Sequence, residues 1–298
     1  MSFITSFVTI FIFLIISTKG EINESQDEST QFDELLKQDH TLVALFTQAC
    51  CACTDCVEAE VLLGGMSQEL EDNLGLLVVR LKSEEMKKRF GIKRLPTLLY
   101  TRNNKTAIYS GKFDHEILYA WLQDNIEPAT VDLDDSSFEH LTQAATGATT
   151  GDWLVIFHDD SCCKNRELMH LETAGVKLKN KVNVASVNIL KAPETKERFK
   201  INTCPHIILF RHQKLYRFSL PDVNSKTLKR FAESFYKNSK SETVPPPLSM
   251  FDKILDKTFE YSKQNPYFVI AFFVLFILST TLFLIWTIMT PSSHKKSD

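Results

Sequence analysis

The sequence predicts an α/β protein of two tandem domains, followed by a single transmembrane helix near the C-terminus. Short apolar runs typical of buried strands alternate with helical segments, which is the pattern of a mostly parallel sheet covered by helices. This series occurs twice, with matching residues 109 positions apart, and residues 267–290 carry no charged side chain. The formal net charge of -3 leaves no excess of Lys and Arg to neutralise phosphates, so nucleic acid is not an expected partner.

Residues 1–20 are predicted to be a signal peptide. Residues 1–18 contain no charged side chain, and Ile10 to Ile16 form an unbroken apolar run that ends in small and polar residues. Such a run is short for a membrane span and is typical of a cleaved secretory leader. An uncleaved N-terminal anchor is the alternative.

The first predicted domain covers residues 30–128 and begins with a helical segment near residues 31–38. A turn at Asn103-Asn104 joins its last two strands into a hairpin. The other expected elements are, in order, the strand Thr41–Phe46, a helix from the cysteines to about Asp72, the strand Leu76–Leu81, the helix Ser83–Phe90, the strands Thr97–Thr101 and Ala107–Ser110, and the helix His115–Asn125.

The second predicted domain covers residues 129–240 and repeats this order. Its expected elements are a helix near Ser137–Ala145, the strand Trp153–Phe157, a helix opened by Cys162-Cys163, the strand Val182–Ile189, the helix Glu194–Phe199, the hairpin His206–Phe210 with Leu215–Phe218, and the helix Ser225–Tyr236.

Four matches place the two segments in one register. Cys-to-Pro distances of 43 residues occur in both. The matches are Cys53 with Cys162, Arg89-Phe90 with Arg198-Phe199, Ile92 with Ile201, and Pro96 with Pro205. Four coincidences at one offset indicate an internal duplication.

Both segments contain a strand that ends in Phe, a Cys at the start of a helix, an Arg-Phe-x-Ile segment, and a Pro before a strand hairpin. This set resembles the thioredoxin fold. With its leader and C-terminal apolar stretch, the chain is most similar to the thioredoxin-related transmembrane members of the protein disulfide isomerase family. The resemblance covers about residues 30–238 and implies two tandem thioredoxin-like domains. It also implies thiol–disulfide exchange with unfolded or cysteine-containing client proteins, without a cofactor.

The resemblance implies an attacking Cys at a helix N-terminus, where free N–H groups and the helix dipole lower the thiol pKa, and a resolving Cys one turn later. Cys53 fits the attacking thiol and Cys56 the resolving thiol. Cys50 and Cys51 lie beside them, so Cys50 with Cys53 is a competing pair. A redox dithiol, a structural disulfide and a metal site all stay open. The metal site is the least favoured of the three, because ligands this close in sequence do not readily complete one tetrahedron. We therefore predict that no metal is bound.

This chain departs from the family pattern in two ways. Thr54-Asp55 stands between the cysteines where the resemblance leads one to expect a His, and Leu45 and Ile156 occupy the positions of a buried proton-relaying carboxylate. Without that base, release of a mixed disulfide is expected to be slow. The prediction is a sluggish, reducing dithiol or none; the alternative is a non-catalytic binding or scaffold protein.

The second segment lacks a resolving Cys at the usual place, where Asn165 stands. Cys162 is therefore predicted to be a monothiol or a relic, with Lys164 favouring its ionisation. The resemblance places the residue before Pro205 opposite the active-site sulfur. Cys204 is thus either an unusual resolving thiol for Cys162 or a small buried residue.

The resemblance also implies that Pro96 and Pro205 are cis and that their loops, with Cys204, bind an extended client strand. Two segments, at Asn23 and Asn104, fit the acceptor pattern for glycosylation.

The C-terminal part is expected to anchor the chain. Residues 241–266 are predicted to be a linker or stalk. Residues 267–290 would reach ~36 Å as a helix, enough to cross a ~30 Å hydrocarbon core. Residues 291–298 would form a cytosolic tail, in which Lys295 and Lys296 resemble the dilysine retrieval signal read by coat-protein machinery.

Together these features predict a single-pass type I protein of the endoplasmic reticulum membrane, with its domains in the lumen. The expected function is thiol–disulfide exchange or client capture during folding of secretory proteins. A cell-surface receptor-like protein is a third reading.

Overall fold

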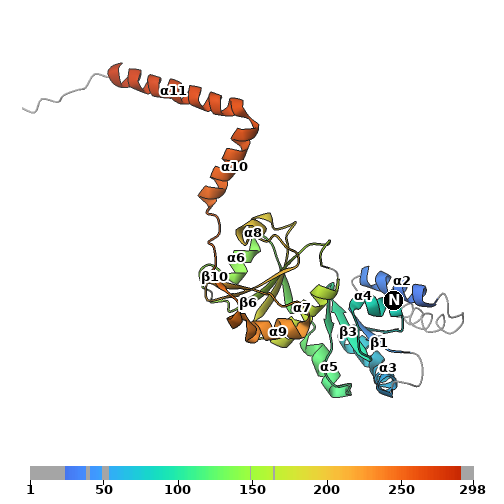
Figure 1. The fold of residues 1–298 in the computed structure, drawn as a ribbon. Coiled ribbons are helices and arrows are strands. Elements are labelled where there is room, and N and C mark those ends of the chain that lie inside the picture. The colour runs from blue at the N-terminus through green and yellow to red at the C-terminus, as the bar shows by residue number, and fades with distance from the viewer. Residues whose placement is uncertain (1–23, 38–40, 49–53, 148, 164, 290–298) are drawn as a thin grey trace, which may run out of the picture. The chain divides into compact units, whose positions relative to one another are not determined.

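The computed structural model describes most of the chain. The described residues are 24–37, 41–48, 54–147, 149–163 and 165–289. The chain divides into two compact units, Met1–Pro245 and Pro246–Asp298. Both sheets of the protein belong to the first unit (Figure 1).

The first sheet has four strands in the order β2-β1-β3-β4. Its strands are β1 (Leu42–Phe46), β2 (Leu77–Leu81), β3 (Thr97–Arg102) and β4 (Lys105–Ile108). The central strand β1 is buried at all five positions, as its unbroken apolar sequence requires. It pairs parallel with β2 and antiparallel with β3. The helices of this part are α2 (Glu24–Lys37), α3 (Thr54–Leu74), α4 (Glu84–Phe90) and α5 (His115–Asp124).

The second sheet has six strands in the order β10-β9-β8-β6-β7-β5. Its strands are β5 (Thr130–Leu133), β6 (Trp153–His158), β7 (Asn183–Asn188), β8 (His206–Arg211), β9 (Lys214–Arg217) and β10 (Ser241–Thr243). Its helices are α6 (Ser137–Thr142), α7 (Asn165–Leu178), α8 (Pro193–Arg198), α9 (Ser225–Glu233) and the 3₁₀ turn η1 (Phe235–Asn238).

The two sheets share one strand arrangement. The order β7-β6-β8-β9 of the second repeats β2-β1-β3-β4 of the first, with the same parallel and antiparallel pairings. The second sheet adds β5 at one edge and β10 at the other. Sequence analysis assigned β10 to a linker, but its three residues pair with β9. The domain boundaries at 128/129 and 240/241 stay a prediction.

The repeated Arg-Phe dipeptide has a packing role in both halves. The buried Phe90 ring lies 6.1 Å from that of Phe46, the last residue of β1. Likewise, the Phe199 ring lies 5.9 Å from that of Phe157 in β6. Such edge-to-face and tilted pairs add to the energy of burial. The duplicated motif therefore fixes the helix before each cis-proline loop against the central strand.

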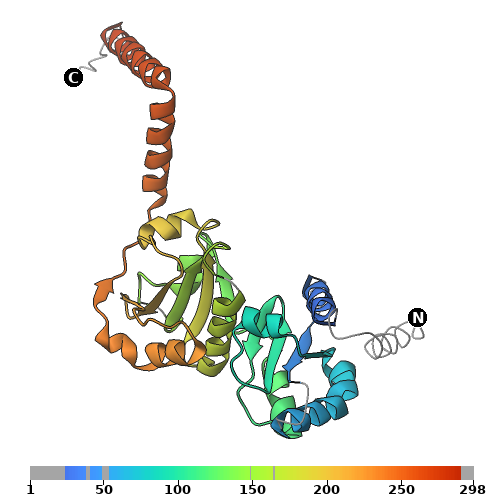
Figure 2. The same cartoon turned by 45° about the vertical axis from the view of Figure 1, so that its right-hand side comes forward.

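Helix α7 packs on both sheets (Figure 2). Its Leu171, Ala174 and Leu178 join a core cluster beneath the second sheet. Met169, by contrast, is 2% exposed and belongs to the apolar cluster of the first sheet, together with Phe32 and Phe90. One helix thus buries apolar residues in the cores of both sheets.

The second unit contains helices α10 (Met250–Gln264) and α11 (Pro266–Met289). In the described part of the chain, no helix has both the length and the apolar character that a membrane crossing requires. The single transmembrane helix predicted at 267–290 is therefore wrong.

Candidate functional site

Cys162 lies in the turn that follows β6 and precedes α7. The Asp159 side chain organises this turn, because its Oδ1 accepts hydrogen bonds from the backbone N–H groups of Ser161 at 2.7 Å and Cys162 at 3.0 Å. The Cys163 N–H donates to the Asp159 carbonyl at 3.1 Å. These bonds hold the chain in a tight turn, and α7 begins at Asn165 rather than at the cysteines as predicted. Cys162 therefore precedes the helix instead of opening it.

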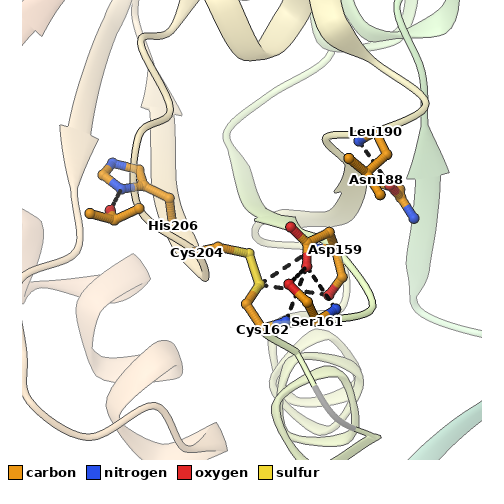
Figure 3. The surroundings of a disulfide bond; sticks show 8 residues. Asp159, Ser161, Cys162, Asn188, Leu190, Cys204 and His206 are labelled. Atoms are coloured by element: carbon orange, nitrogen blue, oxygen red, sulfur yellow. Dashed lines mark hydrogen bonds between the residues drawn. A yellow bond between two sulfur atoms is a disulfide. The ribbon is translucent and has the colours of Figure 1, made fainter.

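A disulfide joins Cys162 to Cys204 across 42 residues, with their Cα atoms 5.6 Å apart (Figure 3). Cys204 precedes Pro205, and the peptide bond between them is cis. Cys204 thus lies beside Cys162, as the family resemblance implies, and its role as a resolving thiol stays a prediction. The two half-cystines contact different apolar clusters. Cys204 packs against the cluster that contains Phe157 and Phe199, and Cys162 packs against the cluster that contains the apolar residues of α7. Both residues are partly exposed.

Two groups of Asp159 act on this sulfur pair. Its backbone N–H points to the Cys162 Sγ at 3.5 Å, which favours negative charge on that sulfur. Its carboxyl has a pKa below the ordinary value, chiefly because the Ser161 hydroxyl and N–H donate to it. The carboxylate is therefore ionised at neutral pH and places negative charge beside the disulfide.

Cys163, adjacent in sequence, has a different environment. It is a free thiol, 6% exposed, and burial raises its pKa to about 12, with smaller contributions from Glu167 and Asp159. A thiol so rarely ionised is a poor nucleophile. Cys163 therefore packs as a small apolar residue, while Cys162 forms the disulfide with Cys204.

His206 follows the cis-proline, and both of its ring nitrogens have partners. Nδ1 lies 3.0 Å from the Thr203 hydroxyl, and Nε2 accepts from the Arg217 guanidinium at 2.8 Å. Burial lowers the pKa of His206, and the Arg217 charge lowers it further. The neutral ring holds the loop after Cys204 in place.

The first segment is described only in part. Cys56 is 2% exposed and disulfide-bonded. The Leu95–Pro96 bond is cis, like its counterpart at Pro205. An open hollow of about 340 Å³ adjoins this proline, lined by Asp55, Glu58, Pro96, Lys112 and Phe113.

Several residues predicted from sequence fall outside the description. These are the signal peptide 1–20, Asn23, Cys50, Cys51, Cys53, Lys164, and the tail with Lys295 and Lys296. Asn104, the other glycosylation candidate, is exposed in the turn between β3 and β4. Modification there stays a prediction.

Leu45 and Ile156 are fully buried apolar residues at the positions expected for a proton-relaying carboxylate. Sequence reasoning missed Asp159 and Ser161. The run Asp159-Asp160-Ser161 carries a signal for them, because Asp followed two residues later by Ser is typical of a side-chain-capped turn.

The model of the thioredoxin-like domain family matches residues 67–234, more than half of the chain. The chain belongs to this family. The matched region includes both cis-prolines, Cys162 and Cys204, and begins after the first cysteine segment.

A thioredoxin domain-containing protein of Theileria parva is 37% identical over 125 residues, which are 42% of this chain and 57% of that protein. The chain thus spans less than two thirds of this relative. Among solved structures, ERdj5 form I has a TM-score of 0.35 at 16% identity, covering 71% of this chain and 30% of that one. Human ERp44 form I has a TM-score of 0.34 at 12% identity, covering 67% and 53%. Likeness at this level supports no conclusion about activity.

Proposed function

We propose that the protein carries out thiol–disulfide exchange through the Cys162–Cys204 pair. The observation that carries this proposal is the disulfide itself, which joins the turn before α7 to the cis-proline loop although no Cys-x-x-Cys motif is present there. A cysteine-containing client protein is the proposed substrate.

The proposed cycle starts from the reduced pair. The Cys162 thiolate attacks one sulfur of a client disulfide; a mixed disulfide forms, and the other client sulfur leaves as a thiolate that takes up a proton. Cys204, deprotonated, then attacks the Cys162 sulfur. The Cys162–Cys204 bond forms, and the second client sulfur leaves and is protonated. The client gains two electrons and two protons, which the pair loses.

The turn supports this division of roles. The Asp159 N–H, 3.5 Å from the Cys162 Sγ, stabilises a thiolate there. Cys204 is the proposed resolving thiol, because the loop of Pro205 holds its sulfur within bonding distance of the Cys162 sulfur. With no carboxylate at Ile156 to accept its proton, resolution is the slow step.

We further propose that this chemistry takes place in an oxidising compartment, the lumen of the endoplasmic reticulum. Disulfides persist in such compartments and are rare in the cytosol. The support is the Cys162–Cys204 bond, the bonded state of Cys56 and the leader-like sequence of residues 1–20.

An insulin-reduction assay with dithiothreitol as electron donor tests the proposal. We expect Cys162→Ser to lose the part of the activity that this pair supplies. We expect Cys204→Ser, reduced and freed of dithiothreitol before insulin is added, to accumulate a client joined to Cys162, visible on a non-reducing gel. Cys163→Ser is the matched control and should behave as wild type. Equal rates for wild type, Cys162→Ser and Cys204→Ser would refute the proposal.

The second candidate is client binding without redox turnover. The apolar Leu45 and Ile156, at the carboxylate positions, favour it. In that case an unfolded peptide would bind the wild type and Cys162→Ser with equal affinity, and no mixed disulfide would form with Cys204→Ser.

A further inference from the structure

Three potential metal ligands meet at the disulfide. One carboxylate oxygen of Asp159 and the sulfurs of Cys162 and Cys204 all lie within 4.8 Å of one another (Figure 3). They come from two loops, one after β6 and one before β8, so no sequence spacing reveals them. All three residues are partly buried, so the cluster is neither sealed in the core nor fully exposed to solvent.

We propose that reduction of the Cys162–Cys204 bond turns this cluster into a site for a divalent transition-metal ion of the zinc class. Cys162, Cys204 and Asp159 supply three ligands, and water fills the fourth position. The proposal goes beyond disulfide exchange and rests on the proposed function only in that the bond must be reducible.

The distances fit a tetrahedral ion. Zn–S bonds of ~2.3 Å and Zn–O bonds of ~2.1 Å place neighbouring ligand atoms roughly 3.4–3.8 Å apart. Once the disulfide is broken, the two sulfurs can separate to this spacing by side-chain rotation, because their Cα atoms are 5.6 Å apart. Neither loop has to be rebuilt.

Hydrogen bonds hold the Asp159 carboxylate in place beside the two sulfurs. Among the described residues, the hydrogen bonds to the Asp159 side chain come from Ser161 and Cys162 and all end on Oδ1. Oδ2 is left as the ligand atom. Hydrogen bonds that fix a ligating carboxylate are characteristic of protein metal sites and strengthen binding.

The set of ligands selects the ion. Two thiolates with one carboxylate suit Zn²⁺ or Co²⁺, whereas Mg²⁺ and Ca²⁺ require oxygen ligands. His206, the nearest His after the cis-proline, is engaged by Thr203 and Arg217 through its two ring nitrogens and is not counted as a ligand.

The chemistry balances with an external dithiol as reductant. The dithiol becomes a disulfide and passes two electrons and two protons to the Cys162–Cys204 bond, which becomes two thiols. Binding of the ion then releases these two protons as the sulfurs coordinate as thiolates. The ion and the disulfide exclude each other, since both use the same two sulfurs. A bound ion therefore withholds both cysteines from exchange.

Titration of the full chain with Co²⁺ tests this proposal, because tetrahedral Co²⁺ bound by thiolates absorbs visible light. The protein is reduced with dithiothreitol, freed of it under nitrogen, and checked by mass for loss of the disulfide. We expect reduced wild type to bind one more equivalent than Cys204→Ser or Cys162→Ser. The cysteines at 50–56 are present in all three proteins, so their contribution cancels.

The variant Asp159→Asn distinguishes a three-ligand site from an ion held by the two cysteine thiolates alone. We expect at least a tenfold loss of Co²⁺ affinity for the extra equivalent, while the exposed neighbour Asp160→Asn leaves it unchanged. Equal uptake by reduced wild type, Cys162→Ser and Cys204→Ser would overturn the proposal, and so would unchanged affinity in Asp159→Asn. If the mass of the treated protein shows that the Cys162–Cys204 disulfide resists dithiothreitol, the proposals of disulfide exchange and of metal binding both fail. If the pair is reduced but the extra equivalent of Co²⁺ is not bound, only the proposal of metal binding is refuted.

Discussion

At the residue scale, neighbouring cysteines differ sharply in reactivity. Cys162 is partly exposed and bonded, whereas Cys163 is 6% exposed with a pKa raised to about 12. The ordinary Cys pKa is about 8.5, so the thiolate fraction of Cys163 at pH 8 is reduced by several orders of magnitude.

We therefore expect Cys163 to resist iodoacetamide in the native protein at pH 8 and to react within minutes in guanidinium chloride. Peptide mass mapping measures both. Raising the pH from 8 to 9.5 should speed the slow native reaction roughly 30-fold without a plateau, because the thiolate fraction of a thiol far below its pKa rises tenfold per pH unit. Rapid native alkylation at pH 8 would show that the thiol is reached by solvent and ionised.

At the scale of elements, α7 is tied to the first sheet by a buried ion pair. Arg102, at the end of β3, donates to Glu172 of α7 at 2.7 Å, and their side chains are 1% and 2% exposed. Glu172 also accepts the N–H groups of Ala129 and Thr130, each at 2.8 Å. Arg102 reaches the Asn125 carbonyl at 2.8 Å through Nε. Nearly all the polar atoms of the pair are thus satisfied, as a buried pair requires.

Glu172→Gln should lower the free energy of unfolding by about 3 kcal/mol, because it leaves a buried guanidinium without its counter-charge. Guanidinium chloride titration measures this loss. The double variant Arg102→Met/Glu172→Gln should recover part of it, since no unpaired charge remains. The control is Glu233→Gln, which removes exposed contacts at 3.7 Å to Lys181 and Lys229 and should cost less than about 1 kcal/mol. Equal losses in Glu172→Gln and the control would contradict this account.

The elements themselves could largely be predicted from sequence. Strands such as Leu42–Phe46 and Asn183–Asn188 are continuous apolar or small-residue runs, and the Asn103-Asn104 turn is set by local conformational preference. The transmembrane prediction for 267–290 used the length, apolar character and flanking residues of the segment and was overturned. Local patterns identify elements, yet they do not show what an element packs against.

The site was only partly predictable for the same reason. The position of Cys204 beside Cys162 came from the family resemblance, since 42 residues separate the two in sequence. Asp159 was missed because its role depends on a turn closed by its own side chain. Glu172 contacts an Arg 70 positions away, and no sequence periodicity reports such a contact.

At the scale of the whole molecule, the two sheets are not independent. The β4 strand donates from the Ile108 N–H to the Thr173 hydroxyl of α7 at 2.9 Å, next to the Arg102–Glu172 pair and the buried Met169. Separation of the sheets would expose an apolar side chain and a carboxylate that are buried together. Both sheets belong to one compact unit, Met1–Pro245, and the domain boundary at 128/129 stays a prediction.

A fragment of residues 126–245 tests this coupling. It keeps the second sheet and the N–H partners of Glu172 but lacks Arg102 and the pocket for Met169. We expect β6 and β7 to exchange amide hydrogens faster in the fragment than in the full chain, because α7 loses one of its two packing faces. Glu172→Gln should cost about 1 kcal/mol or less in the fragment, against about 3 kcal/mol in the full chain, because coupled partners are not additive.

If the fragment is as stable as the second sheet within the full chain and Glu172→Gln costs the same in both, α7 belongs to the second sheet alone. In that case the predicted boundary would divide two independent domains.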